Sequence, residues 1–86
     1  MKTNYYEVAT ANTTYYVRIE RTTGIDGIAR STAMAYGGRY KVLDLSSGER
    51  PRVGGCMFGS TATGRVSTSP VRSVKRISFR AFATAP

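Results

Sequence analysis

Residues 14–21 read Thr-Tyr-Tyr-Val-Arg-Ile-Glu-Arg, and this stretch indicates the class of fold. In an extended chain, Tyr15, Val17 and Ile19 point to one face, and the mostly polar residues between them point to the other. This alternation is typical of a β-strand with one buried face. We therefore predict a strand here and a β-sheet around it.

The same pattern precedes this strand. In residues 4–10, Tyr6 and Val8 share one face, which predicts a second strand. The polar gap at residues 11–13 suits a tight turn, because Asn12 tolerates positive φ angles. The two strands are therefore expected to form an antiparallel hairpin.

The outer face of this hairpin carries charged and aromatic side chains. If residues 12–13 form the turn, Glu7 lies opposite Arg18, and this charge pair favours the register by a few tenths of a kcal/mol. Tyr5 and Tyr16 also fall on the outer face, where they form an aromatic patch. We predict that this patch contacts a partner, whereas the inner tyrosines belong to the core.

The periodicity changes in residues 25–36. Apolar or small residues recur there at the spacing of one helical face, at positions 25, 28, 29, 32, 33 and 36. Thr22 or Thr23 can cap the start of a helix, and Gly37 can end it. We therefore predict a helix over residues 25–36 and interpret residues 24–27 as its entry turn.

Four further segments complete the predicted order. The patterns predict strands at residues 39–45, 52–58 and 74–82, and a long mobile loop around residues 59–70. A chain of 86 residues makes a single domain, residues 1–86. The predicted class is α+β, a small, mostly antiparallel β-sheet of about five strands with one short helix packed on a face.

The residue counts exclude several kinds of site. The chain has no His and one Cys, so it cannot build a site in which His activates a nucleophile, or an ordinary zinc site. We expect no catalytic residues, no metal and no cofactor. Cys56 cannot form an internal disulfide, and we interpret it as a small core residue.

The apolar residues are dispersed along the chain. No run of about 18 apolar residues and no signal peptide are visible in the sequence. The lone cysteine fits a reducing compartment. We expect a soluble cytoplasmic protein without a membrane partner, present as a monomer or a homodimer.

The net charge of +8 is unevenly distributed. Residues 1–49 contain six basic and five acidic residues, whereas residues 50–86 contain seven basic residues and no acidic one. This imbalance indicates an acidic partner, because guanidinium groups bind phosphates and carboxylates through paired hydrogen bonds. An exposed Phe82 on the predicted last strand could also stack on a base. The predicted contacts are Arg50, Arg52, Arg65, Arg72, Lys75, Arg76 and Arg80, with Tyr5, Tyr16 and Phe82 as aromatic contacts.

Residues 36–42, Tyr-Gly-Gly-Arg-Tyr-Lys-Val, lead back into a strand, and Ser47-Gly48-Glu49 suits the turn after it. Together with the small size and a strand pair followed by a short helix, these residues resemble in general style the small accessory proteins of phages and mobile elements, including anti-CRISPR proteins. The resemblance covers residues 4–50. It implies an inhibitor that docks on a nucleoprotein complex in a bacterial host cell, without catalysis. Many such inhibitors are acidic DNA mimics, and this basic chain departs from that pattern.

Three hypotheses about function follow, in order of preference. The first is a non-enzymatic binding protein whose basic surface engages nucleic acid, or a nucleic-acid-processing complex that it inhibits. The second is an adaptor or inhibitor that docks on an acidic protein surface without nucleic acid. The third is a small nuclease-type toxin that uses Arg, Lys, Tyr and Glu side chains.

Overall fold

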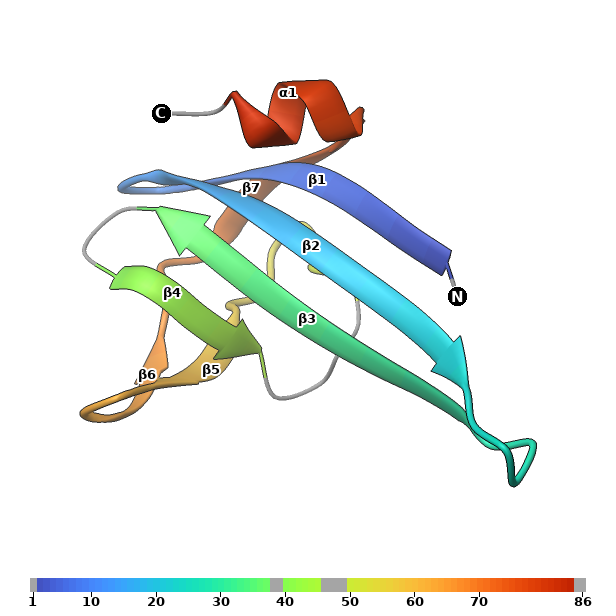
Figure 1. Ribbon diagram of the computed structural model, residues 1–86. Coiled ribbons are helices and arrows are strands. Elements are labelled where there is room, and N and C mark those ends of the chain that lie inside the picture. The colour runs from blue at the N-terminus through green and yellow to red at the C-terminus, as the bar shows by residue number, and fades with distance from the viewer. Residues whose placement is uncertain (1, 38–39, 46–49, 85–86) are drawn as a thin grey trace.

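The computed structural model describes residues 2–37, 40–45 and 50–84, and it contains seven strands followed by one short helix (Figure 1). The elements are β1 (Lys2–Thr10), β2 (Thr14–Thr23), β3 (Ala29–Gly37), β4 (Tyr40–Leu45), β5 (Phe58–Thr61), β6 (Gly64–Ser67), β7 (Val71–Ile77) and α1 (Phe79–Ala83). The strands form one sheet in the order β6-β5-β4-β3-β2-β1-β7, and all neighbours in it are antiparallel.

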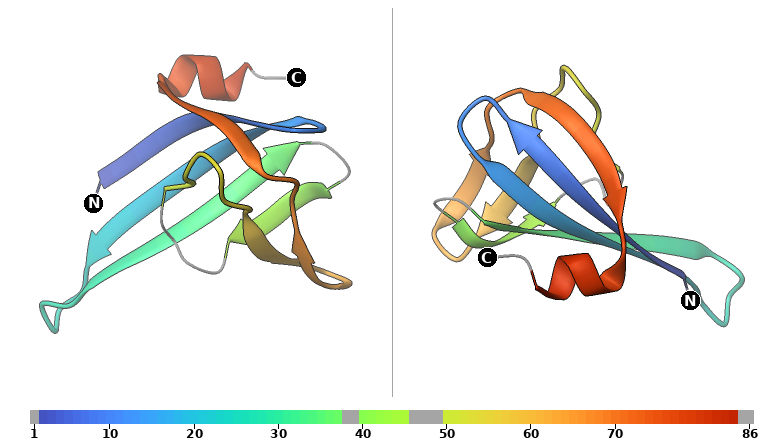
Figure 2. Two further views of the ribbon diagram at one scale, coloured as in Figure 1. Left: turned by 180° about the vertical axis from the view of Figure 1, so that it is seen from behind. Right: turned by 90° about the horizontal axis from the view of Figure 1, so that it is seen from above.

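A three-residue link between the two edge strands curls this sheet. Residues 68–70 alone separate β6, at one edge, from β7, at the other edge. Because an extended chain spans at most about 3.3–3.6 Å per residue, the end of β6 lies within roughly 14 Å of the start of β7. The sheet therefore bends into a partly closed barrel, which is visible from above in Figure 2.

The segment that joins β4 to β5 helps to close the barrel. Val71 at the start of β7 accepts a backbone hydrogen bond from Gly54 (2.8 Å) and donates one to Gly55 (2.7 Å). Just before β7, the backbone N–H of Thr68 donates to Met57 at 2.9 Å. Residues 54–57 therefore bridge the link between the two edge strands.

The core lies inside this curled sheet. Alternate residues of the first four strands point inward, and Val8, Val17 and Leu43 are fully buried. The core consists of Tyr6, Val8, Tyr15, Val17, Ala33, Ala35, Leu43, Leu45, Met57 and Val71. The side-chain alternation predicted for the first hairpin is thus confirmed, with Tyr6 and Tyr15 inside.

The register of that hairpin differs from the expected one by two residues. Glu7 lies opposite Tyr16, and Arg18 lies opposite Tyr5, so the predicted pairing of Glu7 with Arg18 is wrong. Arg18 instead forms an ion pair with Glu20, two residues along on the same strand face. A shift by two residues keeps every side chain on its predicted face.

The helix predicted over residues 25–36 is also wrong. Residues 24–28 form the turn of a hairpin, and β3 continues from there as a strand between β2 and β4. Its inward residues, Ala33 and Ala35, are fully buried. Small side chains at these positions suit the inside of a tightly curled sheet, and backbone pairing on both sides outweighs the local helical spacing.

The segment after residue 58 also differs from the sequence-based expectation. Where a long loop was expected around residues 59–70, β5 and β6 form a hairpin. Phe58, expected in the preceding strand, is the first residue of β5. The strand predicted at residues 52–58 is wrong, because residues 52–57 form no strand. In its place the structure has three strands that were not expected, β3, β5 and β6, which gives seven strands instead of about five.

Cys56 does not belong to the core. Its side chain is exposed, and the neighbouring Met57 is buried instead. The prediction of a small buried cysteine is therefore wrong.

The C-terminal residues form a helix where a strand was expected. The Ser78 hydroxyl accepts a hydrogen bond from the backbone N–H of Ala81 (3.1 Å) and caps α1. The helix packs on the outer face of the sheet, where the ring of Phe82 lies 4.8 Å from that of Tyr5 and 5.7 Å from that of Tyr36. The ring of Phe79 lies 5.5 Å from that of Tyr5. Phe82 therefore holds the helix to the sheet.

Replacing Phe82 with alanine should release α1, because a helix of five residues is not stable without packing. We expect the free energy of unfolding in urea to fall by about 1–3 kcal/mol, and proteolysis of the C-terminal residues to become faster. Arg80→Ala is the matched control, since Arg80 is an exposed residue of the same helix. Equal effects of the two substitutions would contradict this role for Phe82.

Among the described residues, no helix is long and apolar enough to cross a membrane.

Candidate functional site

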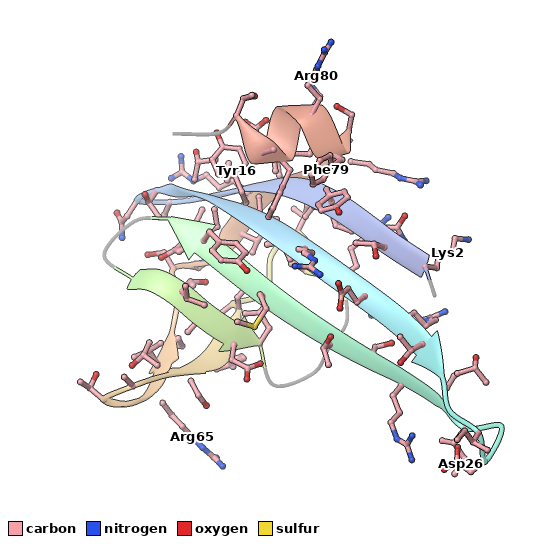
Figure 3. The ribbon with its side chains drawn as sticks, viewed as in Figure 1. Lys2, Tyr16, Asp26, Arg65, Phe79 and Arg80 are labelled. Carbon is pink, nitrogen blue, oxygen red and sulfur yellow. The ribbon has the colours of Figure 1, made fainter. Side chains whose placement is uncertain are left out.

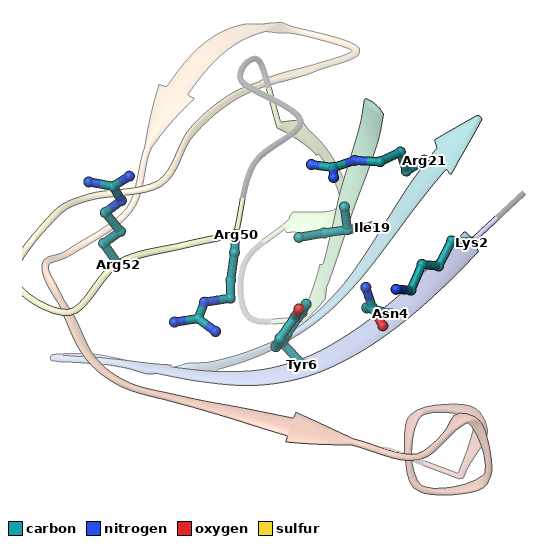
Figure 4. A pocket seen from close by; sticks show the side chains of 7 residues that line it. All are labelled: Lys2, Asn4, Tyr6, Ile19, Arg21, Arg50 and Arg52. Atoms are coloured by element: carbon teal, nitrogen blue, oxygen red, sulfur yellow. The ribbon is translucent and has the colours of Figure 1, made fainter. Parts of the chain in front are cut away.

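A cavity of about 410 Å³ opens on the inner face of the curled sheet (Figure 4). Most of its lining residues are basic, and they come from both halves of the chain. They are Lys2, Asn4, Tyr6, Ile19, Arg21, Arg50 and Arg52. We call this cavity the basic pocket.

The strand period explains how β1 and β2 supply five of these residues. Lys2, Asn4 and Tyr6 alternate along β1 and share its inner face. On β2, Ile19 lies opposite Asn4, and Arg21 lies opposite Lys2. The first hairpin therefore contributes two cationic residues, Lys2 and Arg21, which are paired across the strands at the end of the hairpin opposite its turn.

Arg50 and Arg52 reach the pocket from the segment between β4 and β5. Pro51 between them is buried, whereas both arginines are exposed. The guanidinium carbon of Arg50 lies 6.0 Å from the centre of the Tyr6 ring, a cation–π arrangement. Tyr6 itself is buried, so its ring forms a wall under Arg50.

The pocket gathers positive charge, and among the described residues no carboxylate balances it. Four of its seven lining residues are cationic, and none of the seven is acidic. The ion pairs found among the described residues, Arg18 with Glu20 and Arg30 with Asp26, use no lining residue. Like charges so close repel one another, and a bound anion relieves that repulsion.

Arg76 extends the basic pocket along β7. Its Cα is paired with that of Tyr6, so its side chain lies on the same inner face. Its Nη2 atom donates a hydrogen bond to Oδ1 of Asn4 at 2.9 Å. Because Asn4 lines the pocket, Arg76 adds a further positive charge beside it.

The other predicted basic residues lie elsewhere on the molecule. Arg65 and Arg80 point away from each other at opposite ends (Figure 3). Lys75 lies opposite Glu7 and so on the face opposite to that of Arg76. Arg72 is exposed at the start of β7. Of the seven predicted basic contacts, the structure brings together three: Arg50, Arg52 and Arg76.

The predicted aromatic contacts lie on the outer face, away from the pocket. Tyr5 and Phe82 pack against each other beneath α1. Tyr16 lies between Glu7 and Tyr36 on the same face. Packing of the helix accounts for Tyr5 and Phe82, and their contact with a partner stays a prediction.

Of the four cations that line the pocket, sequence reasoning missed two, Lys2 and Arg21. Lys2 lies four residues before Tyr6, and Arg21 lies two residues after Ile19. Both therefore continue the alternation that places Tyr6 and Ile19 on the inner face. Extending that period to the ends of the two strands would have placed both cations on the inner face. The signal was present in the sequence.

A second cavity, of about 380 Å³, provides a comparison. It lies beside the turn of the first hairpin, and all its lining residues are uncharged: Thr10, Asn12, Thr13, Tyr15, Ser67, Thr68 and Ser69. Positive charge is therefore concentrated at one of these two cavities. Within residues 2–37, 40–45 and 50–84, no group of acidic or cysteine side chains could hold a metal ion.

No family model, no curated protein and no solved structure matches this chain. The resemblance to anti-CRISPR proteins therefore stays a prediction.

Proposed function

We propose that this protein is a non-enzymatic binding protein that holds the phosphate backbone of a nucleic acid in the basic pocket. The observation that carries the proposal is that Lys2, Arg21, Arg50 and Arg52 line one cavity and that none of its described lining residues is acidic. Arginine presents a planar fork of donors that fits phosphate oxygens, and lysine adds a compact charge.

The pocket favours contacts with phosphates over contacts with bases. Stacking on a base needs an exposed aromatic ring, but the ring in this pocket, Tyr6, is buried under Arg50. Phosphate contacts position a nucleic acid without reading its sequence. We therefore propose binding with little sequence preference.

Binding should depend strongly on salt. Four phosphate contacts release bound counterions, so a plot of log affinity against log salt concentration should have a slope of about −4. Affinity for a duplex of about 20–30 base pairs should then fall roughly 150–250-fold between about 50 mM and 200 mM salt. Fluorescence anisotropy with a labelled duplex measures this slope. Affinity that stays constant over this range would reject phosphate binding.

An acidic protein surface is the alternative occupant of the same pocket, because carboxylates also accept paired hydrogen bonds from arginine. Affinity capture from a bacterial lysate, with and without nuclease, separates the two. If nucleic acid is the ligand, nuclease removes the captured material. Capture of one protein complex that survives nuclease would support the alternative. A defence complex among the captured proteins would support the inhibitory role that the resemblance to anti-CRISPR proteins implies.

A further inference from the structure

The hairpin of β2 and β3 projects from the body of the protein as an arm (Figure 1). The pairing of β2 with β1 ends at Arg21. The pairing of β3 with β4 begins only at Ala33, so residues 29–32 of β3 have no partner in β4. Beyond these points, in the part of the chain that the structure describes, residues 22–30 pair only with one another. We call residues 22–30 the arm.

Hydrogen bonds hold the tip of the arm in one conformation. Gly24 donates to the carbonyl of Ile28 (3.0 Å) and accepts from Gly27 (2.9 Å). One carboxylate oxygen of Asp26 accepts from the Ile28 N–H at 3.0 Å, and the other pairs with Arg30 at 2.9 Å. Gly27 has a φ of +78°, which suits glycine. The turn is therefore ordered by its own contacts.

This ordered tip presents two isoleucines to solvent. Ile25 has a relative exposure of 110%, and Ile28 has one of 57%. Water solvates such side chains poorly, and a turn otherwise rich in Gly and Asp has no structural need for them. Two aliphatic side chains at the end of a narrow arm form a small apolar wedge.

The wedge and the basic pocket are joined by β2. Arg21 lines the pocket, and the arm begins with the next residue. A nucleic acid whose phosphates occupy the pocket therefore continues alongside the arm. The carboxylate of Asp26 repels a nearby phosphate only weakly, because both of its oxygens form contacts within the arm and Arg30 balances its charge.

We propose that the arm enters the minor groove of duplex DNA and that Ile25 inserts between two base pairs and kinks the duplex. This inference rests on the proposed function and specifies its substrate as double-stranded DNA. Apolar side chains used in this way unstack one base step from the minor groove. Two isoleucines are too small a surface for a stable protein interface, which buries about 1,200–2,000 Å², but they match a single base step in size.

The test compares the wild-type protein with Ile25→Ser on a duplex of about 30 base pairs that carries a fluorescent dye at each end. Energy transfer between the dyes measures the bend. The wild-type protein should kink the duplex by about 20–90°. Ile25→Ser should leave the duplex straight and weaken binding by roughly tenfold. Val53→Ser is the matched control, because Val53 is an exposed β-branched residue outside the arm, and it should bend DNA like the wild type.

Each outcome has a distinct meaning. If the wild-type protein binds the duplex but leaves it straight, or if Ile25→Ser bends it equally, the inference is wrong and the proposed function stands. If the wild-type protein binds single-stranded DNA or RNA but no duplex DNA, the inference is wrong and the proposed function stands. If it binds no nucleic acid at any salt concentration, both are wrong. If the protein binds vesicles that contain an anionic lipid and Ile25→Ser abolishes that binding, Ile25 inserts into a lipid surface, and the inference about DNA is wrong.

Discussion

Replacing Arg21 and Arg52 together with glutamate is expected to reduce the affinity for nucleic acid by at least about 100-fold at low salt. The double substitution changes the formal charge of the lining residues from +4 to 0, because each replacement turns a cation into an anion. It also removes two guanidinium groups whose hydrogen bonds to phosphate are worth about 1.5–3 kcal/mol each. Anisotropy titration at about 50 mM salt measures the loss.

The control for this experiment is the replacement of Arg65 and Arg80 with glutamate. It changes the total charge of the protein by the same amount, but at two sites that lie at opposite ends of the molecule (Figure 3). We expect this variant to lose less than about tenfold in affinity, by weaker long-range attraction alone. Equal losses in the two variants would show that total charge, and not the pocket, governs binding.

The second large effect concerns the core. Leu43→Ala should lower the free energy of unfolding by about 3–5 kcal/mol, because Leu43 is 0% exposed and lies opposite the small Ala35, which cannot fill the space. A domain of this size has a total stability of roughly 4–13 kcal/mol. The substitution should therefore remove a large part of the total stability and lower the melting temperature clearly.

Val42→Ala is the control for Leu43→Ala. Val42 precedes Leu43 on the same strand, points to the other face and is 44% exposed, so its replacement should cost less than about 1 kcal/mol. Urea unfolding followed by circular dichroism measures both values. If Leu43→Ala proves as stable as Val42→Ala, the assignment of the inner face to the core is wrong.

The sequence predicted the first hairpin well because its signal is local. Inward residues such as Tyr6 and Val17 alternate with outward residues such as Tyr5 and Arg18. This alternation determines which face of each strand is buried, whatever the register between the strands. The register was two residues off, because the side-chain period repeats every two residues and does not distinguish the two pairings. Turn geometry decided between them, with Thr10 bonded to Thr13 at the corner.

Two other segments were assigned the wrong secondary structure: residues 25–36 were predicted as a helix, and the C-terminal residues were predicted as a strand. Residues 25–36 match a helical period, but β3 there is held by backbone pairing with β2 and β4, which no local pattern reports. At the C-terminus, Phe79 and Phe82 are three residues apart, which places them on one side of a helix but on opposite faces of a strand. The N-cap at Ser78 and the rings of Tyr5 and Tyr36 on the sheet favour the helix.

The candidate site was predicted in part. Counting charges by halves of the chain identified Arg50 and Arg52, but it treated residues 1–49 as nearly neutral. In the folded protein none of the described acidic residues of that half, Glu7, Glu20, Asp26 and Asp44, lines the pocket, whereas Lys2 and Arg21 do. Only the sheet order reveals this, since it brings β1 next to β7 and beneath the segment that carries the two arginines.

The pairing of β1 with β7 also bears on how the protein folds as it is made. β1 leaves the ribosome well before β7, the strand that covers its free edge, so Val8 stays unpaired on that side until Val74 has been made. Such distant partners slow folding, because the entropy of closing a long loop is lost before the contact forms. Until then β1 is an unprotected edge on which a second nascent chain can add a strand.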